Sequence, residues 1–253
     1  MNNFITPDWD APNNVHAFMT TRIGGVSEGV YGDVNGFNGL NPATHVGDDV
    51  ADVLQNRALI RALVPSEPQW LNQTHSVKVW HGDYDFDAPP PEADAVVIDQ
   101  VGQVGVVMTA DCLPVVLASA DGAIIAAAHA GWRGLVDGVL EQTLQVMAEK
   151  GAHVEGVHVW LGAAIGPEQF EVGQDVLDAF SRQTSDDVRP FFKPKADGKY
   201  WADLYGLARQ RLIAQGVRRI SGGNHCTVSE PERFYSYRRD RITGRMATLI
   251  WLD

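Results

Sequence analysis

Positive charge and cysteine are both scarce in this chain, and each scarcity excludes a class of protein. The 253 residues contain 20 Lys and Arg against 32 Asp and Glu, which gives a formal net charge of −12. General binding to nucleic acid or to an anionic membrane needs clustered positive charge, so neither is an expected partner. The two cysteines, Cys112 and Cys226, allow at most one disulfide, which excludes a disulfide-stapled scaffold.

The chain also lacks the hydrophobic segments that direct proteins to or through membranes. No apolar run approaches the ~20 residues that a membrane-spanning helix needs. The opening sequence MNNFITPDWD has neither the basic start nor the apolar stretch of a secretory signal. No internal repeat or linker divides the chain. We therefore expect a soluble, cytoplasmic protein with a single domain over residues 1–253.

The apolar runs predict a mixed fold of strands and helices. Residues 51–64 and 203–215 have helical spacing, and residues 135–149 place their apolar side chains on one helical face. Short runs rich in β-branched residues predict strands at 15–22, 77–80, 95–98, 104–108, 114–118, 123–128, 157–162, 234–238 and 246–252. Because strands and helices do not strictly alternate, the pattern favours a layered α/β or α+β fold around a mixed sheet.

A predicted β-hairpin brings a cysteine and a histidine to the same end of the sheet. The dipeptide Asp-Gly at 121–122 lies between two apolar runs and is a strong signal for a hairpin turn. When the strands are paired outward from this turn, Cys112 opposes Gly131 and His129 opposes Pro114. A thiol and an imidazole therefore share the mouth of the hairpin.

A second histidine suggests a zinc site at this place. His75 lies in the polar segment NQTHS at 72–76, just before a predicted strand. Together, His75, Cys112 and His129 offer the thiolate and imidazole ligands that suit zinc, and they leave a fourth position open. Their spacing matches no compact zinc motif, so a buried structural Cys112 is the alternative. The remaining histidines are interpreted as surface or structural residues: His16, His45, His81, His153, His158 and His225.

Glycine and arginine near His129 indicate an anion site. Gly131 and Arg133 precede the helix predicted at 135–149, where free backbone N–H groups attract phosphate or carboxylate. Residues 233–245 contain five more arginines, and arginine outnumbers lysine 15 to 5 in the chain, which suits bidentate anion binding. The alternatives are a glycine-rich turn for the first segment and a solvated charged hairpin for the second.

Long motifs in the same order resemble the YfiH family over nearly the whole chain. They are TTRIGGVSEGVY (20–31), HVGDD (45–49), NR (56–57), QTHS (73–76), TADCLPV (109–115), AAAHAGWRG (126–134), LGAAIGPEQFEVG (161–173) and FYSYRRDRITGRMATLIWL (234–252). Members of that family are called multicopper polyphenol oxidoreductases or laccase-domain proteins, purine nucleoside phosphorylases and peptidoglycan editing factors. The segment GDVNGFNGLNPAT (32–44) is longer than the SLNLG-like segment usual in the family, and we expect this difference to reshape a pocket rim.

The resemblance implies a fold, a metal site and an activity. The implied fold is a three-layer α/β/α arrangement around a mixed sheet, related in shape to hydrolases of the cytotoxic necrotizing factor type. The family's His-Cys-His metal ligands fall on His75, Cys112 and His129, which favours one zinc ion per chain, with copper as the alternative metal in vitro. The implied activity is phosphorolysis of adenosine, inosine and methylthioadenosine to the free base and ribose 1-phosphate, together with adenosine deamination.

A laccase reaction agrees poorly with the histidine content. A multicopper oxidase needs about ten histidines, typically in His-x-His pairs, to hold several copper ions. This chain has 8 histidines and no His-x-His pair. The sequence therefore argues against a polyphenol oxidase with several coppers.

A zinc enzyme acting on a purine nucleoside and phosphate is the leading hypothesis from the sequence. The candidates to bind substrate or phosphate are Arg22, Gly131, Arg133, Arg238 and Arg239. The candidates for catalysis are Cys112, His129, Arg133, Asp111 and Glu171, with the two carboxylates transferring protons. A metal-free cysteine hydrolase, with Cys112 as nucleophile and His129 as base, is the alternative and would act on peptidoglycan precursors. A non-enzymatic ligand-binding protein comes third, and the oligomeric state is left open.

Overall fold

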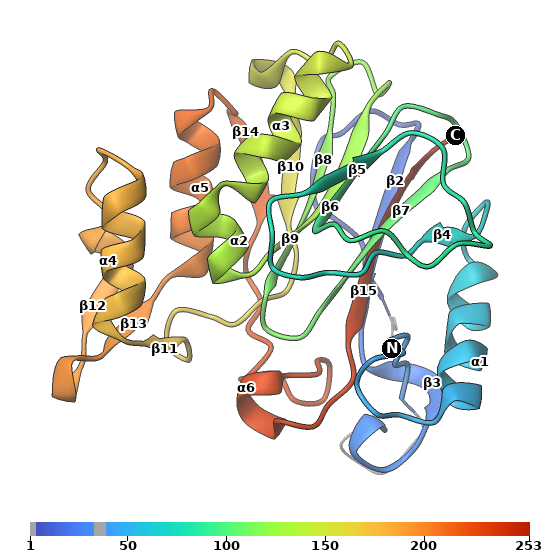
Figure 1. Cartoon of the computed structure of the whole chain (residues 1–253), viewed down its shortest axis with the longest axis horizontal. Coiled ribbons are helices and arrows are strands. Elements are labelled where there is room, and N and C mark those ends of the chain that lie inside the picture. Colours follow the sequence, from blue (N-terminus) through green and yellow to red (C-terminus); the bar gives the residue numbers. More distant parts are fainter. Residues whose placement is uncertain (1–3, 33–38) are drawn as a thin grey trace.

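The buried apolar runs form two mixed β-sheets in a computed structural model that describes residues 4–32 and 39–253 (Figure 1). The order of the first sheet is β1 (Phe4–Ile5), β2 (Val15–Thr20), β15 (Met246–Leu252), β7 (Val104–Thr109) and β4 (Pro68–Gln69). The order of the second is β14 (Arg219–Gly222), β10 (His158–Leu161), β8 (Leu113–Ala118), β9 (Ile125–Ala130), β6 (Ala95–Ile98) and β5 (Val79–His81). Both sheets contain parallel and antiparallel pairs.

Three clusters of buried side chains define how the layers pack. Val107 and Ile250 of the first sheet share one apolar core with Val116 and Ile125 of the second, so the two sheets lie face to face. The helices α3 (Val139–Glu149) and α5 (Leu204–Ala214) cover the outer face of the second sheet. Helix α1 (Val50–Arg61) packs on the outer face of the first sheet. The mixed α/β class predicted from the sequence is confirmed, with helices on the outer faces of the sheets.

The hairpin around residues 121–122 has the predicted register. Strands β8 and β9 are antiparallel, and Pro114 pairs with His129. The connecting loop is wider than a two-residue turn, because the backbone N–H of Ser119 donates to Ile124 O at 2.8 Å and closes the loop there. The Ser119 hydroxyl also accepts from the backbone N–H of Ile124 at 2.9 Å. The predicted strand pairing is still correct, because the wider loop is symmetrical about residues 121–122.

Two predicted elements differ from the structure. The helix expected at 135–149 is two helices, α2 (Trp132–Asp137) and α3, because Gly138 has a φ of 103° and ends the first one. The segment 234–238, predicted as a strand, leads instead into the short helix α6 (Tyr237–Asp240). The Ser236 side chain accepts from the backbone N–H of Arg239 at 3.2 Å and so caps this helix.

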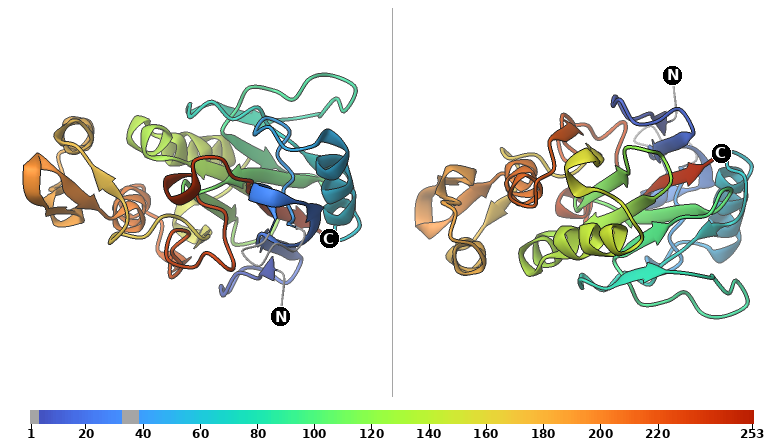
Figure 2. Two further views of the ribbon diagram at one scale, coloured as in Figure 1. Left: turned by 90° about the horizontal axis from the view of Figure 1, so that it is seen from below. Right: turned by 90° about the horizontal axis from the view of Figure 1, so that it is seen from above.

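A lobe that the sequence analysis did not predict projects from one end of the molecule, opposite α1 (Figure 1, Figure 2). It contains α4 (Gln174–Gln183) and a small sheet of β11 (Glu171–Val172), β13 (Tyr200–Ala202) and β12 (Phe192–Pro194). The remaining strand, β3 (Ile23–Ser27), contacts α1.

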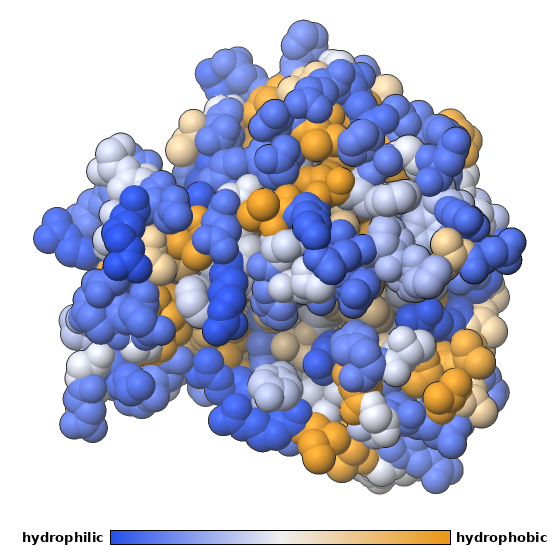
Figure 3. Space-filling model, in the orientation of Figure 1, coloured by the Kyte–Doolittle hydropathy of each residue, from blue (hydrophilic) through white to orange (hydrophobic). Residues whose placement is uncertain are grey.

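The surface of the face in Figure 3 is mostly hydrophilic, with apolar side chains in scattered groups. No helix within the described residues is long and apolar enough to cross a membrane.

Candidate metal centre and its pocket

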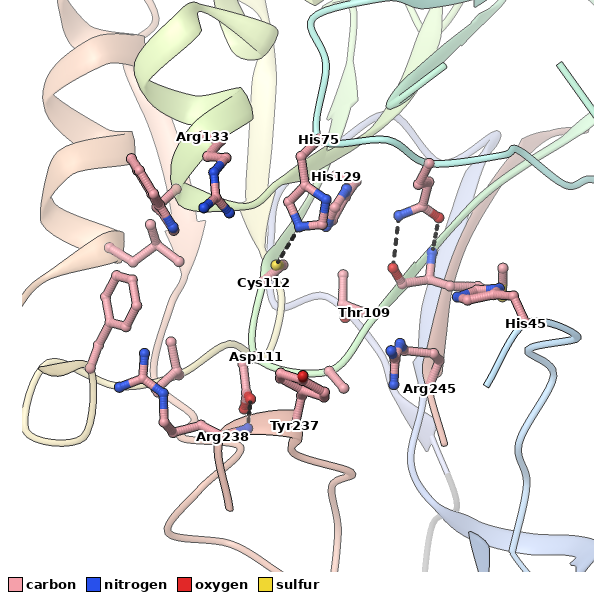
Figure 4. A pocket seen from close by; sticks show the side chains of 17 residues that line it. His45, His75, Thr109, Asp111, Cys112, His129, Arg133, Tyr237, Arg238 and Arg245 are labelled. Atoms are coloured by element: carbon pink, nitrogen blue, oxygen red, sulfur yellow. Dashed lines mark hydrogen bonds between the residues drawn. The ribbon is translucent and has the colours of Figure 1, made fainter. Parts of the chain in front are cut away.

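Three separate segments of the chain bring His75, Cys112 and His129 together (Figure 4). Their potential ligand atoms all lie within 4.8 Å of one another, and Cys112 Sγ is 3.6 Å from His75 Nε2. Cys112 directly precedes β8 and His129 lies near the end of β9, so the hairpin supplies two of the three groups. His75 comes from the loop between β4 and β5, where it adopts a φ of 61°.

Asp94, a residue that the sequence analysis missed, positions both histidines. Its buried carboxylate accepts the backbone N–H of His75 at 3.0 Å and that of Ser76 at 2.6 Å. The same carboxylate lies 2.7 Å from Nδ1 of His129. A carboxylate on one ring nitrogen fixes the tautomer and leaves the other nitrogen free as a ligand. A carboxylate directly before a buried strand was the signal that could have identified it.

The charges of these groups favour an ionised thiol. Burial opposes the thiolate, but the neighbouring His129 and His75 outweigh it and lower the pKa of Cys112 to about 6. Burial also opposes the imidazolium, yet Cys112 and Asp94 raise the pKa of His129 to about 9. Although burial disfavours the Asp94 carboxylate, hydrogen bonds from His129 and Ser76 lower its pKa to about 2. A deprotonated thiol suits both a metal ligand and a cysteine nucleophile.

Gly131 provides the space that the three donor groups need. A Cβ atom at this position would lie 2.8 Å from Cδ2 of His75 and 2.9 Å from Sγ of Cys112. Helix α2 begins directly after Gly131 but is only 6 residues long, so the expected anion site lacks a long helix behind it. The structure thus places Gly131 against the donor groups, and phosphate binding by this residue stays a prediction.

The donor groups fit a zinc ion chemically. One thiolate and two imidazoles are typical zinc ligands, and three protein ligands leave a position open toward substrate. Among residues 4–32 and 39–253, His75, Cys112 and His129 are the group of potential ligands close enough to hold a metal ion. This part of the chain therefore offers no second donor group for a cluster of several copper ions.

The donor groups open into a pocket of about 440 Å³ that is lined by three arginines, Arg133, Arg238 and Arg245. In the described part of the chain, none of the three forms an ion pair with Asp or Glu. Six other arginines do form such pairs: Arg61, Arg189, Arg211, Arg218, Arg233 and Arg239. In a protein with a net charge of −12, arginines without an acidic partner in a pocket indicate an anionic ligand.

Asp111 also lines this pocket, but its carboxylate is engaged by the protein. It accepts the hydroxyl of Thr227 at 2.6 Å, the hydroxyl of Ser236 at 2.7 Å and the backbone N–H of Arg238 at 2.6 Å. Asp111 itself has a φ of 89°, a conformation rare for residues other than glycine. The carboxylate therefore ties together the loops around the pocket, and proton transfer by it stays a prediction.

Arg22, Arg239 and Glu171 do not belong to the described residues that line the pocket. Arg22 is buried and donates to Gly32 O at 3.1 Å, whereas Arg239 donates to the carbonyl oxygens of Thr227 and Phe234. The Glu171 carboxylate accepts a hydrogen bond from Lys195, which lowers the pKa of Glu171. These positions hold the three side chains against the protein, and their predicted roles toward substrate stay predictions.

Two pocket residues did not stand out in the sequence. His45 was interpreted as a surface or structural residue, and Arg245 only as part of an arginine-rich segment, yet both line the pocket. Both belong to motifs that carry the family resemblance, HVGDD and the C-terminal segment 234–252. Membership of such a motif was the signal that could have placed them.

Comparisons with known proteins extend over the whole chain. Residues 16–253 match the family model described as multi-copper polyphenol oxidoreductase laccase. The chain is 46% identical over 253 residues to a Haemophilus influenzae protein named purine nucleoside phosphorylase, and the match covers 98% of this chain and 99% of the other. It is 45% identical to the Escherichia coli purine nucleoside phosphorylase YfiH over 100% of both chains.

Solved structures are similar to this one over the same extent. A Neisseria meningitidis protein superimposes with a TM-score of 0.89 at 44% identity, covering 100% of both chains. The hypothetical protein YfiH of Bacillus licheniformis superimposes with a TM-score of 0.88 at 26% identity, again over 100% of both chains. The fold class and the family resemblance seen in the sequence are thereby confirmed.

Proposed function

Because this chain belongs to the family of multi-copper polyphenol oxidoreductase laccase proteins, many of whose members are named purine nucleoside phosphorylases, we propose that it cleaves purine nucleosides by zinc-dependent phosphorolysis. The observation that carries the proposal is one pocket that joins three metal-ligand groups to three arginines without acidic partners in the described residues. The proposed substrates are inorganic phosphate and adenosine, inosine or methylthioadenosine. The proposed location is the cytoplasm, where reducing conditions keep the free thiols of Cys112 and Cys226 unpaired.

In the proposed reaction, a phosphate oxygen forms a bond to C1′ of the ribose while the bond from C1′ to the purine nitrogen breaks. The electron pair of that bond passes to the purine, which takes up the proton that hydrogen phosphate gives up. The products are the free base and ribose 1-phosphate. An arginine of the pocket binds the phosphate dianion and holds it against the sugar, and the positive charge of the pocket arginines stabilises negative charge in the transition state.

His75, Cys112 and His129 would hold the zinc ion, while Asp94 orients the imidazole of His129 and binds the backbone N–H of His75. Zinc at this place supplies Lewis-acid chemistry. The same donors suit copper, because thiolate is a soft ligand and imidazole also binds copper. We propose adenosine deamination as a second activity, in which water adds at C6 of the purine and ammonia leaves.

Labelled phosphate tests the phosphorylase activity directly. Purified protein is incubated with each nucleoside and radiolabelled phosphate, and label is expected in ribose 1-phosphate in amounts equal to the free base. Cys112→Ala should abolish this product, whereas Arg182→Gln, which removes an exposed charge from α4, should leave it unchanged. If no label enters a sugar with any of the three nucleosides, the protein is not a phosphorylase.

A cysteine hydrolase is the second candidate, and the contact between His129 and Asp94 favours it. An imidazole oriented by a carboxylate and close to a thiol of low pKa resembles the arrangement of cysteine nucleophiles. Such an enzyme would work without metal on a peptidoglycan precursor that carries the wrong amino acid. Hydrolysis of that precursor by chelator-treated protein, but not by Cys112→Ala, would establish this activity.

A further inference from the structure

One side of the pocket offers flat aromatic surfaces. The guanidinium carbon of Arg133 lies 4.6 Å from the centre of the Trp132 ring, and that of Arg238 lies 5.4 Å from the centre of the Phe170 ring. Figure 4 shows both arginines on the same side of the donor groups. Planar guanidinium groups backed by rings suit stacking with a planar heterocycle. This side is thus suited to a purine.

The opposite side is polar and is built around Arg245 (Figure 4). Nη1 of Arg245 donates to Thr243 O at 3.1 Å and to Gly244 O at 3.0 Å, which fixes the direction of the side chain. Its Nε and Nη2 donate to no acceptor within the described residues. Burial lowers the pKa of Arg245, so the cation lies where water is scarce and where attraction for an anion is stronger.

Two further polar groups accompany Arg245. The Thr109 hydroxyl is buried and has no hydrogen-bond partner within the described residues, although Thr109 lines the pocket. Buried hydroxyls are normally satisfied by protein, water or ligand. His45 lines the same pocket and appears beside Arg245 in Figure 4. Burial and the nearby charges of Arg245 and Arg57 lower the pKa of His45.

We propose that inorganic phosphate binds at the Arg245 side of the pocket, with Thr109 and His45 as further partners, while the nucleoside lies at the Arg133 and Arg238 side. Phosphate is small and carries its charge on several oxygens, which matches a free guanidinium edge and an unpartnered hydroxyl. The inference rests on the proposed phosphorylase function and assigns the two substrates to opposite sides of the donor groups.

Measuring KM for each substrate in matched arginine variants tests which side of the pocket binds phosphate and which binds the nucleoside. Arg245→Gln should raise KM for phosphate by about tenfold to a hundredfold, the loss expected for one charged hydrogen-bonding partner. Its KM for adenosine should stay within about threefold of the wild-type value. Arg133→Gln should instead raise KM for adenosine and leave KM for phosphate nearly unchanged. Arg182→Gln on the surface of α4 should change neither KM. Arg245→Lys keeps the charge without the planar fork, and an intermediate KM for phosphate is expected.

Direct binding of inorganic phosphate distinguishes failure of this site from failure of the proposed function. Calorimetry without nucleoside should detect phosphate binding to the wild-type protein and its loss in Arg245→Gln. That result supports the site even if no ribose 1-phosphate is ever formed. Phosphate binding in Arg245→Gln within about twofold of wild type, or no binding by the wild type, would overturn the site even if phosphorolysis is confirmed.

Discussion

Asp94 is the residue whose loss should weaken the metal centre without removing a ligand. Asp94→Asn keeps the size of the side chain, but Nδ1 of His129 loses its charged partner at 2.7 Å. We expect zinc affinity to fall by about tenfold to a hundredfold, measured by competition with a chromogenic chelator. Asp99→Asn is the matched control, because the Asp99 carboxylate contacts Lys150 and lies away from the pocket. Equal zinc affinity in the wild type and in Asp94→Asn would show that Asp94 does not orient the His129 imidazole.

In metal-free protein, the Cys112 thiol should react at lower pH than an ordinary cysteine. Its pKa of about 6 means that the thiolate predominates above that pH and is lost as the pH falls below it. In a Cys226→Ala background, the rate of alkylation by iodoacetamide should therefore be half its plateau value near pH 6.

A variant of His129 checks the cause of this shift. His129→Gln removes the positive charge that stabilises the thiolate, so the midpoint should move toward the ordinary value of about 8.5. A midpoint near the ordinary cysteine value in the protein with His129 intact would contradict the proposed pairing of the two groups.

Among the elements, the hairpin of β8 and β9 is what makes the site predictable from the sequence. A short loop sets an antiparallel register, so Cys112 and His129 could be placed at one end from local pairing alone. His75 and Asp94 come from the segments around β5 and β6, whose places depend on the order of strands in the sheet. Local patterns do not determine that order. The polar segment around His75 suggested this residue as a ligand, and the family resemblance made that interpretation the favoured one.

The break between α2 and α3 is a second feature of element scale, and it depends on Gly138. With a φ of 103°, this residue has a conformation that is strained for any residue with a Cβ atom. A Cβ at this position would come no closer than 3.6 Å to Glu141, so the cost of Gly138→Ala is conformational rather than steric. We expect the free energy of unfolding to fall by about 1–2 kcal/mol in urea denaturation. Gln145→Ala, on the exposed face of α3, should change it by less than about 0.5 kcal/mol.

The projecting lobe shows why some elements escaped prediction. Its strands β11, β12 and β13 have 2 or 3 residues each, too few for an alternating pattern to be recognised. Yet Phe170, directly before β11, lines the pocket, and Glu171 O accepts from Arg238 at 2.9 Å. The lobe therefore completes one wall of a site whose other parts the sequence indicated.

At the scale of the whole molecule, the pocket is built from segments between His45 and Arg245. These segments meet only because both sheets and the lobe are in place. The mixed α/β class could be predicted from strand lengths and composition, whereas the face-to-face packing of two sheets could not. That packing depends on which strands pair over long distances, as β2, β15 and β7 do. The positions of Arg245 and His45 in one pocket follow from the same pairing.

A metal ion bound by three distant segments should stabilise the entire fold, and this gives the last prediction. We expect plasma mass spectrometry to find about one zinc per chain in the wild type, and none in His75→Ala, Cys112→Ala or His129→Ala. His81→Ala, at an exposed position of β5, should keep its zinc.

The unfolding temperature gives a second measure of how zinc binding stabilises the fold. Free zinc at about a thousand times its Kd adds about 4 kcal/mol to the stability of the folded state. For a chain of this length, that corresponds to a rise in Tm of about 8–16 °C. The rise should vanish in the three ligand variants, because their folded state no longer binds zinc in preference to the unfolded one. A wild-type protein that holds no metal and gains no stability from zinc would instead favour the Cys112 and His129 hydrolase, since those residues can act without a metal ion.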